Sequence, residues 1–593
     1  MKKQQSIAEI QEILNRTDKS KLPEIHISVL RNIMIEPIIP YLRYYALDMG
    51  FNAHVVCGEY DNVYQEAVGG NEVLFNKNAE CIIVFMKLDT LSWGLSRNFN
   101  QYNQEQIQGE VARVQDYIKS VLMGIRKQTD AMILWHSFET PTNPSLGIWD
   151  SQTEDGQLNI VGVLNSFLRK ILKDTSNAYF VDLNLCLARV GIAGFYDSRY
   201  WHIGRAPYAR EGLREIALED FKFIRPLKGK NKKCLALDCD NTLWGGIIGE
   251  DGLEGIKLGK THPGSPYYEF QQEIVNLYHR GVIIAMCSKN NEHDVWEVFR
   301  RHPYMVLKEE HIATAQINWN DKAANLRQIA LDLNIGIDSI VFMDDSEFEI
   351  NLVREMLPEV KAIHLPHNRA VEYRDILSRC GLFDTLTVSE EDKNRGVMYK
   401  AESVRKKLLT EATDMISYYK SLEMLLEIRF ANEFSIPRIA QQTQKTNQFN
   451  LTTRRYNEAD IREFTINSDS DVISLKLIDR FGDSGIVGTC ILRYEDKKAI
   501  IDTLLLSCRV LGRGVEDAFI IQALKLAKKR GCESVIGEYY ATRKNAQVES
   551  FYSKYGFQEL SDGNNKADKS FIYDLMKGAG TEPDFFKQID SEI

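Results

Sequence analysis

The N-terminal part of the chain alternates short apolar runs with segments of helical periodicity. Five runs stand out, and each is bounded by polar or turn-forming residues: Ile25–Ile33, Ala53–Cys57, Cys81–Met86, Ala131–Trp135 and Ala178–Leu183. Continuous apolar runs of this length are typical of parallel strands whose sheet is covered by helices on both faces. The pattern therefore predicts a doubly wound α/β domain at the start of the chain.

A second α/β pattern follows the polar segment Pro226–Lys233, which we interpret as a linker. The elements that we expect there alternate in type: strand Cys234–Leu237, helix Tyr267–Arg280, strand Val282–Cys287, helix Asn320–Leu333 and strand Ser339–Met343. From Val388 to Leu426 the sequence is charged and helical, which indicates a connector. The part from Glu427 to Met576 is rich in strand patterns and contains one clear helix, Val515–Arg530.

Composition and charge narrow the class of protein. A chain of 593 residues is too long to fold around a single hydrophobic core, so about three or four domains are expected. The composition, 44% hydrophobic and 26% charged, is typical of soluble globular proteins, and no apolar run reaches membrane-spanning length. A net charge of −10 makes nucleic acid an unfavourable partner.

The first residues predict an amphipathic helix rather than a signal peptide. Ten cysteines without CxxC pairs favour free thiols in a reducing cytoplasm and no structural zinc.

The candidate chemistry begins where the strand Cys234–Leu237 ends. The sequence there is Lys233-Cys-Leu-Ala-Leu-Asp-Cys-Asp-Asn-Thr-Leu-Trp-Gly-Gly246, with two carboxylates, Asp238 and Asp240, on either side of Cys239. Buried carboxylates need compensation, and a divalent cation such as Mg²⁺ prefers hard oxygen ligands. A thiol between them adds the capacity for acyl transfer.

Later strand ends supply the remaining parts of a phosphoryl-transfer site. Ser288 ends one strand, Lys322 begins a helix, and the pair Asp344-Asp345 ends a further strand. Asp238 is expected to be the nucleophile. Asp240 is expected to be the general acid and a metal ligand through its backbone carbonyl. Thr242, Ser288 and Lys322 would bind phosphate, and Asp238, Asp240, Asp344 and Asp345 would hold magnesium.

This ordered set resembles the haloacid dehalogenase (HAD) superfamily, whose four motifs match Leu235–Thr242, Ser288, Lys322 and Asp344-Asp345. Only 33 residues separate Ser288 from Lys322, too few for a large cap, and the segment after Thr242 has room only for a flap. The resemblance therefore implies a capless, Rossmann-like HAD domain whose open site suits a carrier-borne or macromolecular substrate.

Two segments resemble the FkbH-like family (HAD subfamily IIIC) more specifically: Leu237–Ile256, and Gln444-Lys-Thr-Asn-Gln-Phe-Asn-Leu451. The resemblance covers nearly the whole chain. It implies an enzyme that takes a glyceryl group from 1,3-bisphosphoglycerate, removes phosphate, and loads glyceryl onto an acyl carrier protein for polyketide or related secondary metabolite biosynthesis. In that chemistry Cys239 would carry the glyceryl thioester. The alternative is that Cys239 has no catalytic role and is a small apolar residue of the core.

The C-terminal part contains Arg509-x-x-Gly512-x-Gly514 followed by a helix, and later the segment Asn545–Phe557. Both resemble signatures of GNAT acyltransferases. Glycines before a helix let backbone N–H groups face a phosphate. The resemblance implies an α+β domain in which Arg509, Gly512, Gly514 and Asn545 bind coenzyme A or the phosphopantetheine of a carrier protein. A GNAT fold kept only for packing is the alternative.

The N-terminal domain resembles an SGNH hydrolase that has lost its catalytic residues. Its first strand lacks a Gly-Asp-Ser block, and Asp197 and His202 are too far apart for Asp-x-x-His. The expected organisation is therefore an α/β multidomain chain. Its parts are an SGNH-like domain (1–225), a HAD domain (230–385), a helical connector (386–426), a GNAT-like domain (427–577) and a tail (578–593).

Three functions remain open at this point. The leading hypothesis is glyceryl transfer with phosphate removal. A plain HAD phosphatase acting on a phosphorylated small molecule and a GNAT-type acyltransferase using acyl-CoA are the alternatives.

Overall fold

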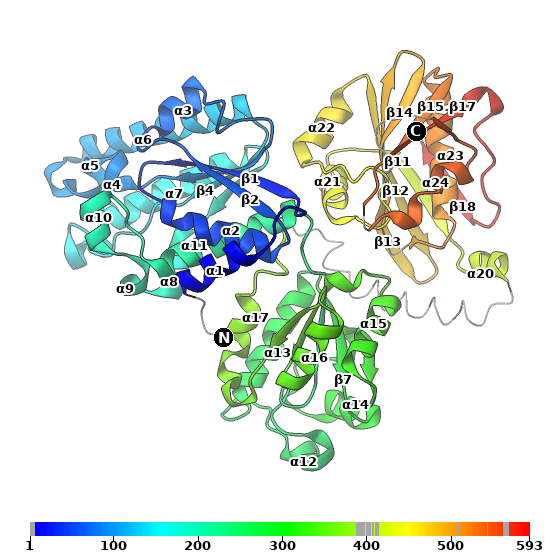
Figure 1. The fold of residues 1–593 in the computed structure, drawn as a ribbon, viewed down its shortest axis with the longest axis horizontal. Coiled ribbons are helices and arrows are strands. Elements are labelled where there is room, and N and C mark those ends of the chain that lie inside the picture. The colour runs from blue at the N-terminus through cyan, green and yellow to red at the C-terminus, as the bar shows by residue number, and fades with distance from the viewer. Residues whose placement is uncertain are drawn as a thin grey trace. The chain divides into compact units, whose positions relative to one another are not determined.

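The computed structural model describes residues 6–386, 398, 405, 408, 414–507, 510–542, 544–560 and 568–593. It divides into two compact units, Met1–Lys230 and Asn231–Ile593 (Figure 1). Much of the predicted connector 386–426 lies outside the described residues. No helix in the described part of the chain combines the length and apolar character that crossing a bilayer requires.

The first unit is a parallel sheet in the order β2-β1-β3-β4-β5. Its strands are β1 (Glu24–Arg31), β2 (Asn52–Cys57), β3 (Ala79–Phe85), β4 (Met132–His136) and β5 (Ala178–Val181). Each of the five predicted apolar runs overlaps one of these strands. Side chains of β3 and β4 are almost entirely buried, which explains why these strands appear as unbroken apolar runs.

Helices cover both faces of this sheet (Figure 1). One group consists of α1 (Ile7–Arg16), α2 (Ile39–Asp48), α8 (Leu183–Val190) and α11 (Arg210–Leu227), and the other of α3 (Val63–Gly69), α6 (Gln104–Gln128) and α7 (Gln157–Lys173). Shorter turns of helix lie between them: η1 (Glu36–Ile38), α4 (Leu88–Leu91), α5 (Trp93–Ser96), η2 (Phe99–Gln101), η3 (Gly147–Gln152), α9 (Ile192–Phe195) and α10 (Ser198–Gly204). Helix α1 is amphipathic as predicted, with Ile10 and Leu14 buried.

The second unit begins with another parallel sheet, in the order β10-β9-β6-β7-β8. Its strands are β6 (Cys234–Leu237), β7 (Ile283–Ser288), β8 (Ile312–Ile317), β9 (Ile340–Asp344) and β10 (Lys361–His364). Its helices are α12 (Ile248–Gly255), α13 (Ser265–His279), α14 (Glu292–Arg301), α15 (Lys322–Asp332), α16 (Glu347–Met356) and α17 (Tyr373–Ser378), with η4 (Glu309–His311), η5 (Ile337–Ser339) and η6 (His367–Glu372). The sequence predicted β6, β7 and β9 but not the outer strands β8 and β10.

Alternation along β6 divides its side chains between two cores. Leu235 and Leu237 pack in one apolar cluster, whereas Cys234 and Ala236 pack in the other, on the opposite face of the sheet. Because β6 is central in the sheet, the chain that leaves it emerges between the ends of β7 and β9. The carboxyl end of β6 is therefore enclosed by neighbouring loops, which positions the candidate site.

The rest of the second unit is a mixed sheet in the order β16-β17-β15-β14-β13-β12-β11-β18. Its strands are β11 (Leu425–Phe430), β12 (Ser470–Asp479), β13 (Gly482–Glu495), β14 (Lys498–Leu506), β15 (Ser534–Tyr539), β16 (Gln558–Leu560), β17 (Lys569–Asp574) and β18 (Gln588–Glu592). The helices are α20 (Met415–Ser421), α21 (Ile436–Lys445), α22 (Glu458–Ile466), α23 (Val515–Lys529) and α24 (Phe551–Lys554), with η8 (Ala546–Val548) and η9 (Leu575–Lys577). Helix α23 coincides with the predicted helix.

Candidate active site

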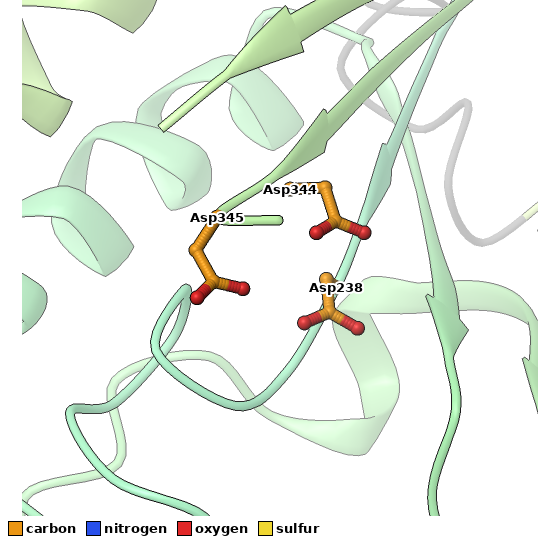
Figure 2. A group of neighbouring side chains, drawn as sticks. All are labelled: Asp238, Asp344 and Asp345. Carbon is orange, nitrogen blue, oxygen red and sulfur yellow. The ribbon is translucent and has the colours of Figure 1, made fainter. Parts of the chain in front are cut away.

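Three carboxylates meet at the carboxyl edge of the central sheet. Asp238 directly follows β6, Asp344 ends the adjacent strand β9, and Asp345 comes next in the chain. Each offers one oxygen, and these oxygens all lie within 4.8 Å of one another. Figure 2 shows the three side chains converging on one region. The structure thus brings together at one edge three predicted site residues, of which Asp238 is far from the other two in the sequence.

Lys322 joins two of these carboxylates. Its Nζ lies 2.6 Å from Oδ1 of Asp238 and 2.5 Å from Oδ2 of Asp344, and the lysine is only 3% exposed. Burial disfavours the ammonium form, but attraction to Asp238 and Asp344 outweighs it and raises the pKa of Lys322. The lysine is therefore a fixed positive charge beside the expected nucleophile.

One ammonium group does not balance three carboxylates. Burial, followed by repulsion from Asp238, raises the pKa of Asp344 to about 7 and that of Asp345 to about 6. A divalent cation held by Asp238, Asp344 and Asp345 would offset this charge, and carboxylate oxygens are the ligands that Mg²⁺ prefers. The residues present thus fit the predicted magnesium site.

Two buried hydroxyl groups lie at the same edge. Thr242 Oγ1 and Ser288 Oγ belong to residues that are 0% and 1% exposed, and neither meets the geometric criteria for a hydrogen bond with a partner among the described residues. Unpaired buried hydroxyl groups are costly and uncommon. Both were predicted to bind phosphate, and a phosphoryl oxygen is a suitable acceptor for each.

Asp240 has a different environment from the three clustered carboxylates. Its Oδ1 accepts hydrogen bonds from Trp244 Nε1 at 2.9 Å and the Ile248 backbone N–H at 3.0 Å, and its Oδ2 accepts one from Asn290 Nδ2 at 2.8 Å. The side-chain oxygens of Asp240 are not among those that converge in the carboxylate cluster. This leaves its backbone carbonyl as the predicted metal ligand. The three hydrogen bonds lower the pKa of Asp240, but burial outweighs them and raises it above its usual value. A raised pKa suits a group that must carry a proton.

No role was predicted for Trp244 or Asn290. Trp244 follows the first motif, four residues after Asp240, and Asn290 lies two residues after Ser288, just beyond the end of β7. Their position beside motif residues was the available signal. Their contact with one carboxylate arises only from tertiary structure.

Cys239 lies on the core side of the chain. It is fully buried and packs in the same cluster as Leu235, Leu237 and Trp244, in keeping with the alternation of β6. Burial, followed by the charge of Asp238, raises the pKa of its thiol well above the usual range. This environment disfavours the thiolate that a nucleophilic role for Cys239 requires.

The predicted phosphopantetheine residues are distributed around the mixed sheet. Arg509 lies outside the described residues. Gly512 and Gly514 both have positive φ, +76° and +70°, and form the turn that starts α23, as expected. The hydroxyl group of Tyr419 donates a hydrogen bond to the Gly512 carbonyl at 3.0 Å, and a Cβ at Gly514 would collide with the ring of Phe585. Side chains of this unit thus cover part of the turn.

Asn545 is committed to contacts inside the protein. It is fully buried, and its amide group donates to the carbonyls of Asn450 at 2.9 Å and Tyr540 at 3.0 Å. Its Oδ1 accepts a hydrogen bond from the Thr542 N–H at 2.8 Å. In this structure Asn545 therefore positions backbone rather than facing a ligand.

Asp197 and His202 do not pair with each other as a hydrolase dyad would. Asp197 caps α10 and pairs with Arg199, at 2.8 Å between Oδ2 and Nη2, while His202 is exposed on that helix. A Gly482-Asp-Ser484 sequence does occur in the second unit, but it lies at the β12–β13 hairpin, where Asp479 pairs with Gly482.

Comparison with solved structures gives a match that covers about two thirds of this chain. The N-terminal part of the protein BF1531 from Bacteroides fragilis, which contains a phosphatase domain complexed with Mg, is 28% identical to this chain; the match covers 65% of this chain and all of that one, with a TM-score of 0.58. No family model matches the sequence, and comparison with curated proteins gave no match.

Matches to acetyltransferases each cover about a quarter of the chain. The ribosomal-protein-S18-alanine N-acetyltransferase of Escherichia coli is 14% identical over 25% of this chain and 90% of its own length, with a TM-score of 0.21. The spermidine/spermine N-acetyltransferase SpeG of Vibrio cholerae is 13% identical over 26% of this chain and 95% of its own length, again with a TM-score of 0.21. The predicted fold class is confirmed: the chain is an α/β multidomain protein with two parallel sheets followed by a mixed one.

Proposed function

We propose that this chain is a magnesium-dependent phosphohydrolase of the haloacid dehalogenase type, with its active site at the carboxyl edge of the central sheet. The observation that carries the proposal is the bridging position of Lys322 between Asp238 and Asp344, with Asp345 completing the metal-binding group. The similarity to the Bacteroides fragilis structure that contains a phosphatase domain supports it. When bound, the cation supplies positive charge that neutralises the phosphoryl oxygens.

The residues of the chain account for each proton and bond. Asp238 attacks phosphorus, and the bond from phosphorus to the leaving oxygen breaks. Asp240, held by Trp244, Ile248 and Asn290, donates its proton to that oxygen. Lys322 balances the charge of Asp238. Asp240 then accepts a proton from water as the water attacks the phosphorus of the aspartyl phosphate. The bond from phosphorus to Asp238 breaks, which releases inorganic phosphate and regenerates the Asp238 carboxylate.

The test is phosphate release from small phosphate esters with and without Mg²⁺. Wild-type protein should release phosphate only with the cation, and Asp238→Asn should lose the activity because an amide is not a nucleophile. Asp150→Asn changes a buried aspartate of the first unit and serves as the control. Equal rates in wild type and Asp238→Asn would contradict the proposal.

A finer proposal concerns the substrate. The resemblance to the FkbH-like family supports 1,3-bisphosphoglycerate as the donor and an acyl carrier protein as the acceptor of the glyceryl group. In this scheme Cys239 attacks the acyl phosphate, phosphate leaves, the second phosphate is hydrolysed at Asp238, and the carrier thiol takes the glyceryl group by thioester exchange. Cys239 is fully buried, which weighs against formation of a thioester at that residue. Its burial says nothing about whether the glyceryl group is transferred to a carrier protein by another route.

Intact-protein mass spectrometry separates these two parts. After incubation with 1,3-bisphosphoglycerate and Mg²⁺, a thioester mechanism requires a glyceryl adduct on wild type that is absent from Cys239→Ala. From its position in the core we expect Cys239→Ala to load a carrier protein normally. Loss of loading in a folded Cys239→Ala protein would instead establish the thioester.

A further inference from the structure

Four polar side chains lie together at the amino ends of β1 and β2 in the first unit. β2 is the edge strand of its sheet, and β1 is its neighbour (Figure 1). Glu24 and His26 of β1 are in register with Asn52 and His54 of β2. Because residues two apart on a strand point to the same face, these four side chains share one face of the sheet. Further along β1, residues 27–31 are all buried, so the polar group is confined to the strand ends.

Two imidazole rings and one carboxylate converge in this group. The rings of His26 and His54 are stacked, with centroids 4.9 Å apart and planes 15° from parallel. Nε2 of His26 lies 3.3 Å from one oxygen of Glu24, and Nε2 of His54 lies 3.1 Å from the other. The same nitrogen of both rings is thus directed at a single carboxylate.

These three side chains are open to solvent, unlike the other histidine–carboxylate pair of the same sheet. The side chains of His26, His54 and Glu24 are 28%, 44% and 57% exposed. His136 instead lies in the core, where its Nε2 is 2.8 Å from Asp220 and a dissolved ion has no access. Exposed ion pairs add little to stability. The three converging donors are therefore better suited to binding an ion from solution than to holding the fold together.

The donor set selects the kind of ion. Two imidazole nitrogens and a carboxylate oxygen suit zinc and similar divalent transition metals, whereas magnesium prefers oxygen ligands alone. A tetrahedral ion about 2.0–2.1 Å from each nitrogen requires the two nitrogens to be about 3.3 Å apart. The stacked rings would tilt toward each other to reach this distance, and their partial exposure leaves room for that rotation. The lack of CxxC pairs argues against a zinc site built from cysteines and does not bear on this one.

We propose that Glu24, His26 and His54 form a second metal site, which binds zinc or a similar divalent transition-metal ion through two imidazole nitrogens and one carboxylate oxygen. Water completes the coordination. The ion joins the edge strand β2 to β1, and a sheet edge is where strands are least restrained. The site belongs to the first unit, so it is independent of the proposed phosphohydrolase function and of the cation at Asp238.

Calorimetric titration of the full chain with Zn²⁺ tests the site. The titration uses Asp344→Asn protein, in which the carboxylate cluster of the second unit is disrupted. His54→Ala in this background should weaken zinc binding by at least about 10- to 100-fold, the loss that even an outer-shell partner causes. His311→Ala is the matched control, because His311 lies near His279 but their centroids are 6.5 Å apart and their planes 73° apart. It should bind zinc as its parent does.

Electron paramagnetic resonance with one equivalent of Cu²⁺ identifies the ligands directly. Asp344→Asn protein should show coupling to two imidazole nitrogens, and adding either His26→Ala or His54→Ala should leave one. Zn²⁺ should also raise the midpoint of thermal unfolding of the first unit, and His54→Ala should abolish the rise. Equal zinc affinity with and without His54→Ala, or two nitrogen couplings that persist in His26→Ala, would overturn the site. Loss of phosphate release in folded His54→Ala protein would overturn its independence from the second unit.

Discussion

Asp238 and Asp240 are two residues apart and have different surroundings, which fits the different roles proposed for them. Asp238 pairs with Lys322, at 2.6 Å between Oδ1 and Nζ, and lies among the three carboxylates that would hold the metal. Asp240 is partly buried and receives three hydrogen bonds from Trp244, Ile248 and Asn290. Two carboxylates in different environments can serve one proposed site as nucleophile and as general acid.

This separation predicts the pH dependence of the activity. Because burial raises the pKa of Asp240, its acid form persists to higher pH than that of an exposed aspartate. Activity that depends on this acid is present below the folded pKa and is lost as the pH rises through it. Asp240→Asn should lower kcat for alkyl phosphates by about 10²- to 10⁴-fold and remove the alkaline fall.

An aryl phosphate provides the matched comparison for Asp240→Asn. Its leaving group departs without a proton, so the loss in kcat should be much smaller than with an alkyl phosphate. Steady-state rates measured across pH for both substrates check the expectation. Equal losses for the two substrates would show that Asp240 acts on a step other than protonation of the leaving group.

At the scale of elements, the neighbouring strands β14 and β15 pair directly over part of their length, and beyond that another segment of the chain lies between them. They pair in parallel only from Lys498–Ile501 with Ser534–Gly537. Beyond that, the Leu451 N–H bonds the Leu504 carbonyl at 3.2 Å, and the Leu451 carbonyl accepts from the Tyr540 N–H at 2.9 Å. The Gln444–Leu451 segment thus closes the gap between the strand ends, and Asn545 holds it through the Asn450 carbonyl.

Asn545→Ala should therefore destabilise the mixed sheet. The change leaves the buried carbonyls of Asn450 and Tyr540 without their donor, which costs about 1–3 kcal/mol in the free energy of unfolding. Chemical denaturation measures the loss, and alanine at the exposed Asn467 should have a smaller effect. A residue that served only to bind coenzyme A would instead lose affinity for that ligand at unchanged stability.

The sequence was informative about elements whose residues are uniformly buried. The central strands β3, β4, β6 and β7 appeared as apolar runs, and the candidate site residues at strand ends followed from them. The edge strand β8 did not appear, because its Thr314 and Gln316 face partly outward and break the pattern. The orientation of Cys239 toward the core could be predicted, because side chains alternate along a strand and Cys239 falls on the same face as Leu235 and Leu237. The contact of Asn290 with Asp240 was not available, since it depends on how two loops meet.

On the scale of the whole molecule, every proposed catalytic residue belongs to the second unit, Asn231–Ile593. The first unit has a complete parallel sheet and its own apolar core. A unit with its own core can unfold as a separate cooperative transition. Ligand binding stabilises only the unit that contains the site.

We therefore expect two thermal transitions, of which one responds to magnesium. With the cation at about 100 times its dissociation constant, the second unit should gain about 2.7 kcal/mol, and a chelator should reverse the gain. Calorimetry on residues 1–230 and 231–593, expressed separately, assigns each transition. The fragment 231–593 should hydrolyse p-nitrophenyl phosphate with the kcat/KM of the full chain, because its site is intact. A folded but inactive fragment would mean that the first unit contributes a residue to the reaction, and magnesium would then shift both transitions of the full chain.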